Sequence, residues 1–110
     1  MTDKIVVLST CASAEEAERL ARMLVEARLA ACVTALPGAR SFYRWNGAIE
    51  SADEILLVIK TSRELSGEIA AALQKSHSYE IPEVLALPVV DGSGSYLAWL
   101  GSNLKANDIA

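Results

Sequence analysis

Residues 41–47, Ser-Phe-Tyr-Arg-Trp-Asn-Gly, contain the clearest turn signal in the chain. Asn46 and Gly47 both tolerate positive φ, so this pair predicts a two-residue β-hairpin turn. We expect one strand to enter the turn through the aromatic residues and a second to leave through Ala48 and run to Ile59. Pro37-Gly38 interrupts the first strand and predicts a bulge or bend. The stretch therefore predicts a long, kinked hairpin with aromatic side chains near its tip.

A strand and a helix are predicted on the N-terminal side of this hairpin. Residues 5–8, Ile-Val-Val-Leu, form a short run rich in β-branched residues, which is typical of a buried strand. Ser13-Ala14-Glu15-Glu16 has the form of a capping box, in which Ser13 accepts a backbone hydrogen bond and Glu16 reaches back to the helix start. Helical spacing then predicts a helix that packs one face on a core, through Ala17, Leu20, Ala21 and Leu24.

A helix, a strand and a last short helix are predicted on the C-terminal side. Residues 61–64 repeat the capping-box pattern before a helix that carries Leu65, Ile69, Ala72 and Leu73 and ends at residues 77–80. Residues 84–90 predict a fourth strand, and Pro88 places it at an edge or at a bulge. Ser95 is expected to cap the final helix.

The order of elements is β-α-β-β-α-β followed by a helix. This order predicts an α+β fold, a ferredoxin-like βαββαβ sandwich, as a single domain over residues 1–110. In this arrangement both main helices lie on one face of an antiparallel sheet. The other face and the sheet edges have to be covered or paired. We expect the hairpin and the C-terminal helix to make these contacts between subunits.

Composition and charge argue against several classes of protein. The 110 residues are 52% hydrophobic, which favours an oligomer. They carry 14 acidic and 10 basic residues, with the basic ones scattered singly, so no nucleic-acid partner is expected. The longest apolar runs are too short to span a bilayer, so no membrane association is expected. Residues 5–8 are also too short for a secretory signal, which predicts a cytoplasmic protein with Cys11 and Cys32 as free thiols.

No enzyme template fits the chain. Gly92 and Gly94 follow the fourth strand without the Lys-Ser/Thr pair of a phosphate-binding loop, and no G-x-S-x-G motif occurs. An RNA-recognition domain shares the βαββαβ order, but residues 55–59 are aliphatic where its stacking aromatics would lie. We therefore expect no catalytic activity.

An ordered series of short motifs resembles the CutA divalent-cation tolerance family along the whole chain. No single motif is decisive, but their order and spacing together are specific. The series comprises residues 29–33 (Leu-Ala-Ala-Cys-Val), Pro37-Gly38, 43–47 (Tyr-Arg-Trp-Asn-Gly), 59–61 (Ile-Lys-Thr), 77–83 (His-Ser-Tyr-Glu-Ile-Pro-Glu), 86–88 (Ala-Leu-Pro), Tyr96-Leu97 and Trp99-Leu100.

The resemblance implies a ferredoxin-like subunit and a tightly packed homotrimer with strand pairing between subunits. It also implies an association with tolerance to copper and other divalent cations. The trimer of that family is similar in architecture to the PII signalling proteins, and no accepted enzymatic reaction comes with the family name.

The resemblance further implies a copper site, from which this sequence departs. Copper ligation in some members is attributed to a cysteine at the end of the first strand and to a His-His pair. Ser9 stands at the position of that cysteine, Cys11 follows two residues later, and the pair becomes Ser76-His77. Cys32 matches a family cysteine. The expected metal ligands are therefore His77, Cys32 and Cys11, with a polar helix end and small buried cysteines as the open alternatives.

A second group of residues predicts a ligand-binding cleft between subunits. Lys60 ends an apolar strand, and Tyr79, Glu80 and Glu83 lie around a proline; Trp45 is expected to join them. The two glutamates can supply oxygen ligands or accept a hydrogen bond from the histidine that precedes them. The open alternative is that the lysine simply reaches water and the glutamates are ordinary solvated carboxylates.

Four aromatic residues are expected at the trimer interface: Phe42, Tyr43, Trp45 and Trp99. The sequence thus predicts a homotrimeric, cytoplasmic protein that binds copper or another divalent cation and contributes to metal tolerance. The alternative is a PII-like trimeric signalling scaffold, whose intersubunit clefts bind a small anionic ligand or a partner protein.

Overall fold

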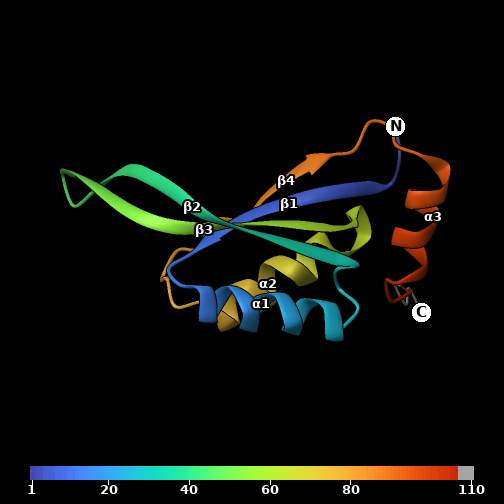
Figure 1. The fold of residues 1–110 in the computed structure, drawn as a ribbon, viewed down its shortest axis with the longest axis horizontal. Helices are drawn as coiled ribbons and strands as arrows, with labels where there is room; N and C mark the ends of the chain where they lie inside the picture. Colours follow the sequence, from blue (N-terminus) through green and yellow to red (C-terminus); the bar gives the residue numbers. More distant parts are fainter. Residues whose placement is uncertain (107–110) are drawn as a thin grey trace.

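The computed structural model describes residues 1–106, so the last four residues of the predicted domain lie outside the described part. Figure 1 shows a four-stranded sheet with helices below it and a long hairpin that projects beyond it. The elements are β1 (Lys4–Cys11), α1 (Ala14–Glu26), β2 (Cys32–Trp45), β3 (Ala48–Ser62), the 3₁₀ turn η1 (Arg63–Leu65), α2 (Ser66–Ser76), β4 (Leu85–Pro88) and α3 (Gly94–Ser102).

The strand order is β2-β3-β1-β4, and every neighbouring pair is antiparallel. This is the predicted ferredoxin-like arrangement, in which α1 and α2 lie on the same face of the sheet (Figure 1). The fourth strand pairs only with β1, so the prediction from Pro88 of an edge position is confirmed. Each described helix is too short or too polar to cross a membrane.

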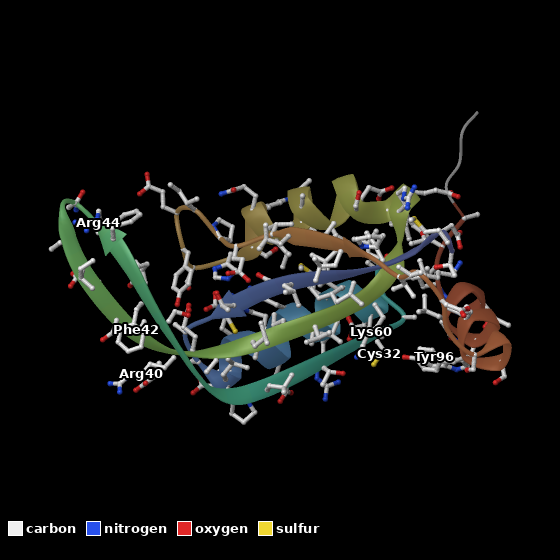
Figure 2. All side chains as sticks on the ribbon, turned by 90° about the horizontal axis from the view of Figure 1, so that it is seen from above. Cys32, Arg40, Phe42, Arg44, Lys60 and Tyr96 are labelled. Atoms are coloured by element: carbon white, nitrogen blue, oxygen red, sulfur yellow. The ribbon has the colours of Figure 1, made fainter. Side chains whose placement is uncertain are left out.

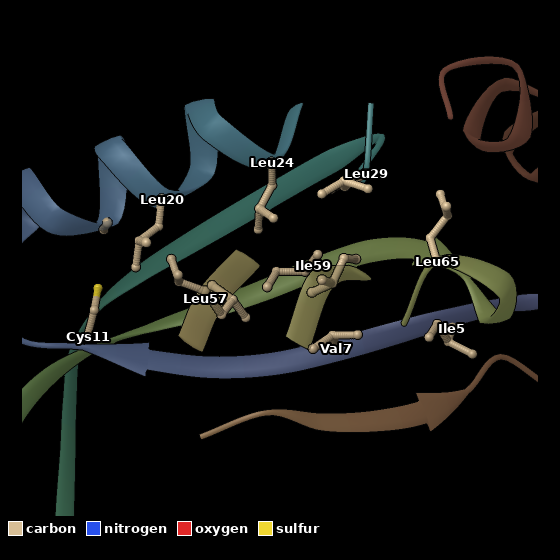
Figure 3. Packing of buried hydrophobic residues seen from close by; sticks show 13 residues of the cluster. Ile5, Val7, Cys11, Leu20, Leu24, Leu29, Leu57, Ile59 and Leu65 are labelled. Atoms are coloured by element: carbon tan, nitrogen blue, oxygen red, sulfur yellow. The ribbon is translucent and has the colours of Figure 1, made fainter. Parts of the chain in front are cut away.

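The core lies between this face of the sheet and the two helices (Figure 3). Alternate residues of β1 and β3, such as Val7 and Ile59, point toward the helices, where Leu20 and Leu24 of α1 meet them. Leu57, Ile59, Leu20 and Leu24 are fully buried. Apolar side chains that repeat every two residues along the strands and every 3.6 residues along the helix therefore meet in one apolar layer.

The hairpin has the turn and the bulge that its sequence predicts. Asn46 and Gly47 have φ of 50° and 80°, as a two-residue turn with two positive φ values requires. The pairing of β2 with β3 shifts register between Leu36 and Ala39, and Gly38 between them has φ of 86°. The outer half of the hairpin therefore bends away from the sheet and leaves a free space on one side.

Two of the three predicted helix caps are wrong. Thr61 does not cap α2, because its side chain is fully buried and donates a hydrogen bond to the Leu29 carbonyl at 2.6 Å. The helix instead begins after η1, without a side-chain cap. Ser93, rather than Ser95, caps α3 and accepts from the Tyr96 N–H at 3.3 Å. The cap at Ser13 is confirmed, since its hydroxyl accepts from the Glu16 N–H at 3.1 Å.

The sheet face opposite the helices carries apolar side chains that no described element covers. Leu87 and Leu85 of β4 are 47% and 56% exposed, and Leu36 of β2 is 44% exposed. Cys32 and Lys60 lie on this same face. Val6 of β1 points away from the core, because it alternates with the buried residues of that strand. Lys60 is the cross-strand partner of Val6, and Cys32 is the cross-strand partner of Lys60, so all three side chains share one face. We call this surface the open sheet face.

Candidate functional site

Cys32, Lys60 and Thr34 form a polar cluster on the open sheet face. The Lys60 ammonium donates to Thr34 Oγ1, and it also lies 3.7 Å from Cys32 Sγ. The thiol is half-buried, so a soft metal ion can reach it. Figure 2 shows Lys60 and Cys32 side by side at the α3 end of the sheet, far from the hairpin tip with Arg44.

Cys11 lies at the opposite end of β1 and faces the core. Its side chain is fully buried, and its thiol lies 3.7 Å from the Ser13 carbonyl, to which it donates. Burial raises the pKa of the Cys11 thiol, and the negative charge of Glu16 raises it further. A buried thiol that resists ionisation is a packing residue rather than a ready metal ligand. Ser9, two residues earlier, is also fully buried.

His77 forms the C-terminal cap of α2, as its place in the sequence predicts, and its side chain is fully buried. Its Nε2 lies 2.7 Å from the Thr10 carbonyl, which can only accept, so Nε2 carries the proton. Its Nδ1 accepts from the Tyr79 N–H at 3.0 Å. Both ring nitrogens of the neutral imidazole are therefore engaged, and neither offers a lone pair to a metal ion.

The three sequence-predicted metal ligands do not converge within one chain. Cys32 pairs with Lys60 of β3, whereas Cys11 pairs with Ile55, five residues and about 17 Å along the same strand. In residues 1–106, no three His, Cys, Asp or Glu side chains are grouped closely enough to hold a metal ion. A metal centre made of His77, Cys32 and Cys11 of one subunit thus does not fit this structure.

Glu16 is the carboxylate that lies next to His77, a position that the sequence assigned to Glu80 or Glu83. Its Oε2 accepts from the Ser78 N–H at 2.7 Å and lies 3.7 Å from His77 Nδ1. Its Oε1 accepts from the Ser78 hydroxyl at 2.9 Å and from the Ala12 N–H at 3.4 Å. Burial by itself raises the pKa of Glu16, but the hydrogen bonds from Ser78 and Ala12 outweigh it and lower the pKa overall.

A pocket of about 850 Å³ lies between the outer half of the hairpin and the loop of residues 77–83. We call it the hairpin pocket. Four of the five residues predicted for a ligand cleft line it: Trp45, Tyr79, Glu80 and Glu83. Lys60 does not line it. Thr10, which lines the pocket, pairs with Leu56 of β3, and Lys60 lies four residues, or about 13 Å, further along that strand.

Glu54 and Tyr79 form the inner wall of this pocket, and sequence reasoning missed the role of Glu54. The Tyr79 hydroxyl donates to Glu54 Oε2 at 2.7 Å, and the Tyr79 ring lies 4.7 Å from the His77 ring. Burial and the adjacent Glu54 carboxylate raise the pKa of Tyr79. Glu54 is 8% exposed, although it follows Asp53 in an acidic stretch that looks like solvated hairpin. No local sequence signal shows that Glu54 is buried and Asp53 is exposed.

The aromatic residues predicted for an interface are all exposed in the single chain. Phe42 is 68% exposed and Trp45 is 46% exposed on the hairpin, and Trp99 of α3 is 47% exposed. Figure 2 places Phe42 next to Arg40 on one side of the hairpin, where the guanidinium lies 5.8 Å from the ring centre. Tyr43 and Trp45 alternate onto the other side, and all three aromatic residues of the hairpin contribute to the lining of the hairpin pocket.

The comparisons with known proteins agree on one family. The family model described as CutA1 divalent ion tolerance protein matches residues 5–103. The Divalent-cation tolerance protein CutA of Pectobacterium atrosepticum is 43% identical over 105 residues, which cover 96% of this chain and 96% of that protein. Protein CutA, chloroplastic, of Arabidopsis thaliana is 41% identical over 101 residues, which cover 92% of this chain and 56% of that protein.

A solved structure gives the same assignment. The crystal structure of CutA from Xylella fastidiosa matches with a TM-score of 0.92 at 42% sequence identity, over 94% of this chain and 100% of that chain. The likeness in sequence and in fold therefore extends over nearly the whole chain. This chain belongs to the CutA divalent-cation tolerance family.

Proposed function

We propose that this chain is a cytoplasmic homotrimer that binds divalent or soft cations, copper foremost, and contributes to metal tolerance. The observation that carries the proposal is family membership, since the family is named for divalent-cation tolerance rather than for a reaction. The cytoplasm keeps thiols reduced, which preserves the free Cys32 thiol that the proposed site needs.

Cys32 is the metal ligand in this proposal. It is the more accessible of the two cysteines, and a thiolate is the ligand that soft copper prefers. The ammonium group of Lys60, 3.7 Å away, balances the charge of a thiolate at this position. His77 and Cys11 are assigned to packing, because the first has both nitrogens bonded and the second is buried.

One cysteine cannot complete a metal site, so the proposal requires residues from more than one subunit. The open sheet face supplies a reason for the subunits to meet there. It exposes Leu36, Leu85 and Leu87 beside Cys32, and apolar surface of this kind is covered in stable proteins. A homotrimer packed through this face brings copies of Cys32 toward a shared region.

The alternative function, a scaffold that binds a small anionic ligand around Lys60 and Glu80, has less support. Glu80 lines the hairpin pocket with three other glutamates, which repel an anion. Lys60 lies outside that pocket and already donates to Thr34. An anion at Lys60 would therefore have to bind at the open sheet face, without the pocket.

Native mass spectrometry of the reduced protein, titrated with Cu(I), Cu(II) and Zn(II), tests the proposal. We expect an assembly of three times the 11.7 kDa chain that takes up a fixed number of copper ions. Cys32→Ser should abolish this uptake. Cys11→Ser is the matched control, because it removes a thiol that is buried, and it should leave the uptake unchanged.

Two results would contradict the proposal. A trimer without stoichiometric copper uptake would remove the metal function while leaving the assembly intact. Equal uptake by the wild type and by Cys32→Ser would show that the metal binds elsewhere.

A further inference from the structure

His77 is buried at a point where three segments of the chain meet. Its ring contacts β1 through Thr10, α1 through Glu16 and the 77–83 loop through Tyr79, and its side chain is fully buried. It is also the only histidine in the chain. Histidine is the side chain whose ordinary change of charge falls between about pH 5 and pH 8. A change in the charge of His77 therefore acts inside the molecule rather than at its surface.

The two ring nitrogens respond differently to a proton. Nε2 donates to the Thr10 carbonyl at 2.7 Å, and it does so whether the ring is neutral or charged. Nδ1 accepts from the Tyr79 N–H at 3.0 Å, which requires the lone pair of a neutral ring. A proton on Nδ1 turns this atom into a donor and leaves two N–H groups facing each other. The bond to β1 therefore survives protonation, whereas the bond to Tyr79 does not.

Glu16 offers the protonated Nδ1 a new partner. Its Oε2 lies 3.7 Å from Nδ1, just beyond hydrogen-bond distance. A bond between an imidazolium N–H and a carboxylate is roughly twice as strong as a bond between neutral groups. Nδ1 thus has one partner for each charge of the ring, which are the Tyr79 N–H for the neutral form and Glu16 for the charged form.

Glu16 keeps its negative charge over the range in which a histidine titrates. Burial by itself raises the pKa of Glu16, but the hydrogen bonds from Ser78 and Ala12 outweigh it and lower the pKa below the ordinary value of 4.5. Arg19, which lies 3.4 Å from the same carboxylate, is half exposed, so the surrounding water and salt screen its effect on the ring. The carboxylate is therefore available to an imidazolium.

The other titratable groups on the neighbouring segments do not compete for the proton. Cys11 of β1 stays a thiol, because burial raises its pKa. Tyr79 stays a phenol, because burial and the Glu54 carboxylate raise its pKa. Glu54 of β3 accepts from the Tyr79 hydroxyl at 2.7 Å. Glu16 is thus the group that compensates the charge of a protonated His77.

The bond that protonation breaks belongs to the connection between the loop and the hairpin. Because the Tyr79 hydroxyl donates to Glu54 of β3, Tyr79 joins the 77–83 loop to the β2–β3 hairpin. Ser78 before it stays bonded to Glu16 through its N–H and its hydroxyl. The charge of His77 therefore acts on the part of the loop that begins at Tyr79.

We propose that His77 is a pH-sensitive switch of the 77–83 loop: on protonation its Nδ1 releases the Tyr79 N–H and donates to Glu16 instead. The neutral state holds Tyr79 in place beside the hairpin, and the charged state loosens it. This switch goes beyond the proposed function and is independent of it. Cys32, the proposed metal ligand, is the partner of Lys60 on β3, about 13 Å along that strand from the partner of Thr10.

Nuclear magnetic resonance of the wild-type assembly tests the switch, because one histidine per chain gives one set of imidazole signals. The imidazole nitrogen spectra and the hydrogen exchange of the Tyr79 amide are recorded between about pH 8 and pH 5. We expect a proton on Nε2 alone at the upper end of this range and on both nitrogens at the lower end. After correction for the intrinsic effect of pH, exchange of the Tyr79 amide should accelerate by about tenfold or more, with the same midpoint.

Two variants test the role of Glu16. Glu16→Gln removes the charge that favours the imidazolium, so it should lower the midpoint by about half a pH unit or more. Glu15→Gln is the matched control, because it removes the same charge from an exposed position in the same helix turn, and it should leave the midpoint unchanged.

Three results would overturn the proposal. The first is a ring that stays neutral down to about pH 5. The second is a ring that titrates while exchange of the Tyr79 amide stays unchanged, and the third is an equal shift of the midpoint in both variants. If Glu16→Gln does not fold, the two wild-type measurements still decide the matter. Copper uptake at Cys32 enters none of these measurements, so a failure of the switch and a failure of the proposed function are distinguishable.

Discussion

Glu16 connects α1 to the 77–83 loop, and its charge makes this connection sensitive to pH. The carboxylate accepts four hydrogen bonds, two of them from Ser78, and its pKa is lowered from the ordinary value of 4.5. A lowered pKa in the folded state stabilises the fold at pH values above the unfolded pKa, and this contribution is lost as the pH falls through the folded pKa. Glu16→Gln should therefore lower the free energy of unfolding by about 2 kcal/mol at pH 7.

The loss should shrink toward zero as the pH falls below the ordinary pKa of 4.5 and through the lowered folded-state pKa of Glu16, because the wild-type carboxylate becomes protonated as well. Urea unfolding across this pH range measures the difference. Glu15→Gln is the control, since it removes a charge from the same helix turn at an exposed position, and it should stay within about 0.5 kcal/mol of wild type. A Glu16→Gln deficit that is independent of pH would contradict the assignment.

Single side chains were the least predictable feature of the site. The capping pattern identified Glu16 correctly at the helix start, but its bonds to Ser78 join residues 62 positions apart, which no local pattern encodes. Glu54 and Asp53 are adjacent acidic residues on opposite sides of the hairpin, and the first is buried on the side where Tyr79 contacts it, whereas the second is exposed. For the same reason the sequence groups Lys60 with Tyr79 and Glu80 in one cleft, although Lys60 lies along the sheet from the other two.

The hairpin depends on Gly47 for its turn, and this dependence predicts the effect of a methyl group. Gly47 has φ of 80°, which costs a residue with a Cβ atom about 1 kcal/mol or more. Gly47→Ala should lower the free energy of unfolding by about that amount. Gly67→Ala is the matched control: it lies in α2 with open space around it, so the same methyl group should stabilise the helix by several tenths of a kcal/mol.

Thermal unfolding of the two variants gives the comparison. The midpoint should fall for Gly47→Ala and rise for Gly67→Ala, because the two positions differ in φ and not in space. A fall of equal size in both variants would show that glycine is needed at these positions for some reason other than turn geometry.

The elements themselves were predictable because their signals are local. Asn46-Gly47 determined the turn, Pro37-Gly38 the bulge and Pro88 the edge strand, and each acts through φ or a missing N–H within a few residues. The prediction of a helix cap at Thr61 failed because its hydroxyl donates a hydrogen bond to the carbonyl of Leu29, 32 residues away. Local chemistry thus predicts where elements begin until a tertiary contact competes for the same group.

The proposed assembly of the protein is argued from the sheet face that the fold leaves open. The helices bury one face, and the other exposes Leu36, Leu85 and Leu87 together with the half-buried side chains of Val6 and Leu8. An apolar surface of this kind favours association, which is also what the 52% hydrophobic content indicates. The proposed metal site requires the same association, since one chain contributes one accessible thiol.

A charge on this face should therefore separate the subunits without unfolding them. Leu87→Glu places a carboxylate on β4 opposite Val6, at a side chain that is 47% exposed in the single chain, so the monomer fold tolerates it. Sedimentation equilibrium should show wild type at three times 11.7 kDa and the variant at one chain. Val25→Glu introduces the same charge at an apolar side chain that is 42% exposed on α1, and it should leave the trimer intact. If wild type is a monomer, or if both variants remain trimers, the open sheet face is not the interface, and the copies of Cys32 have no reason to meet.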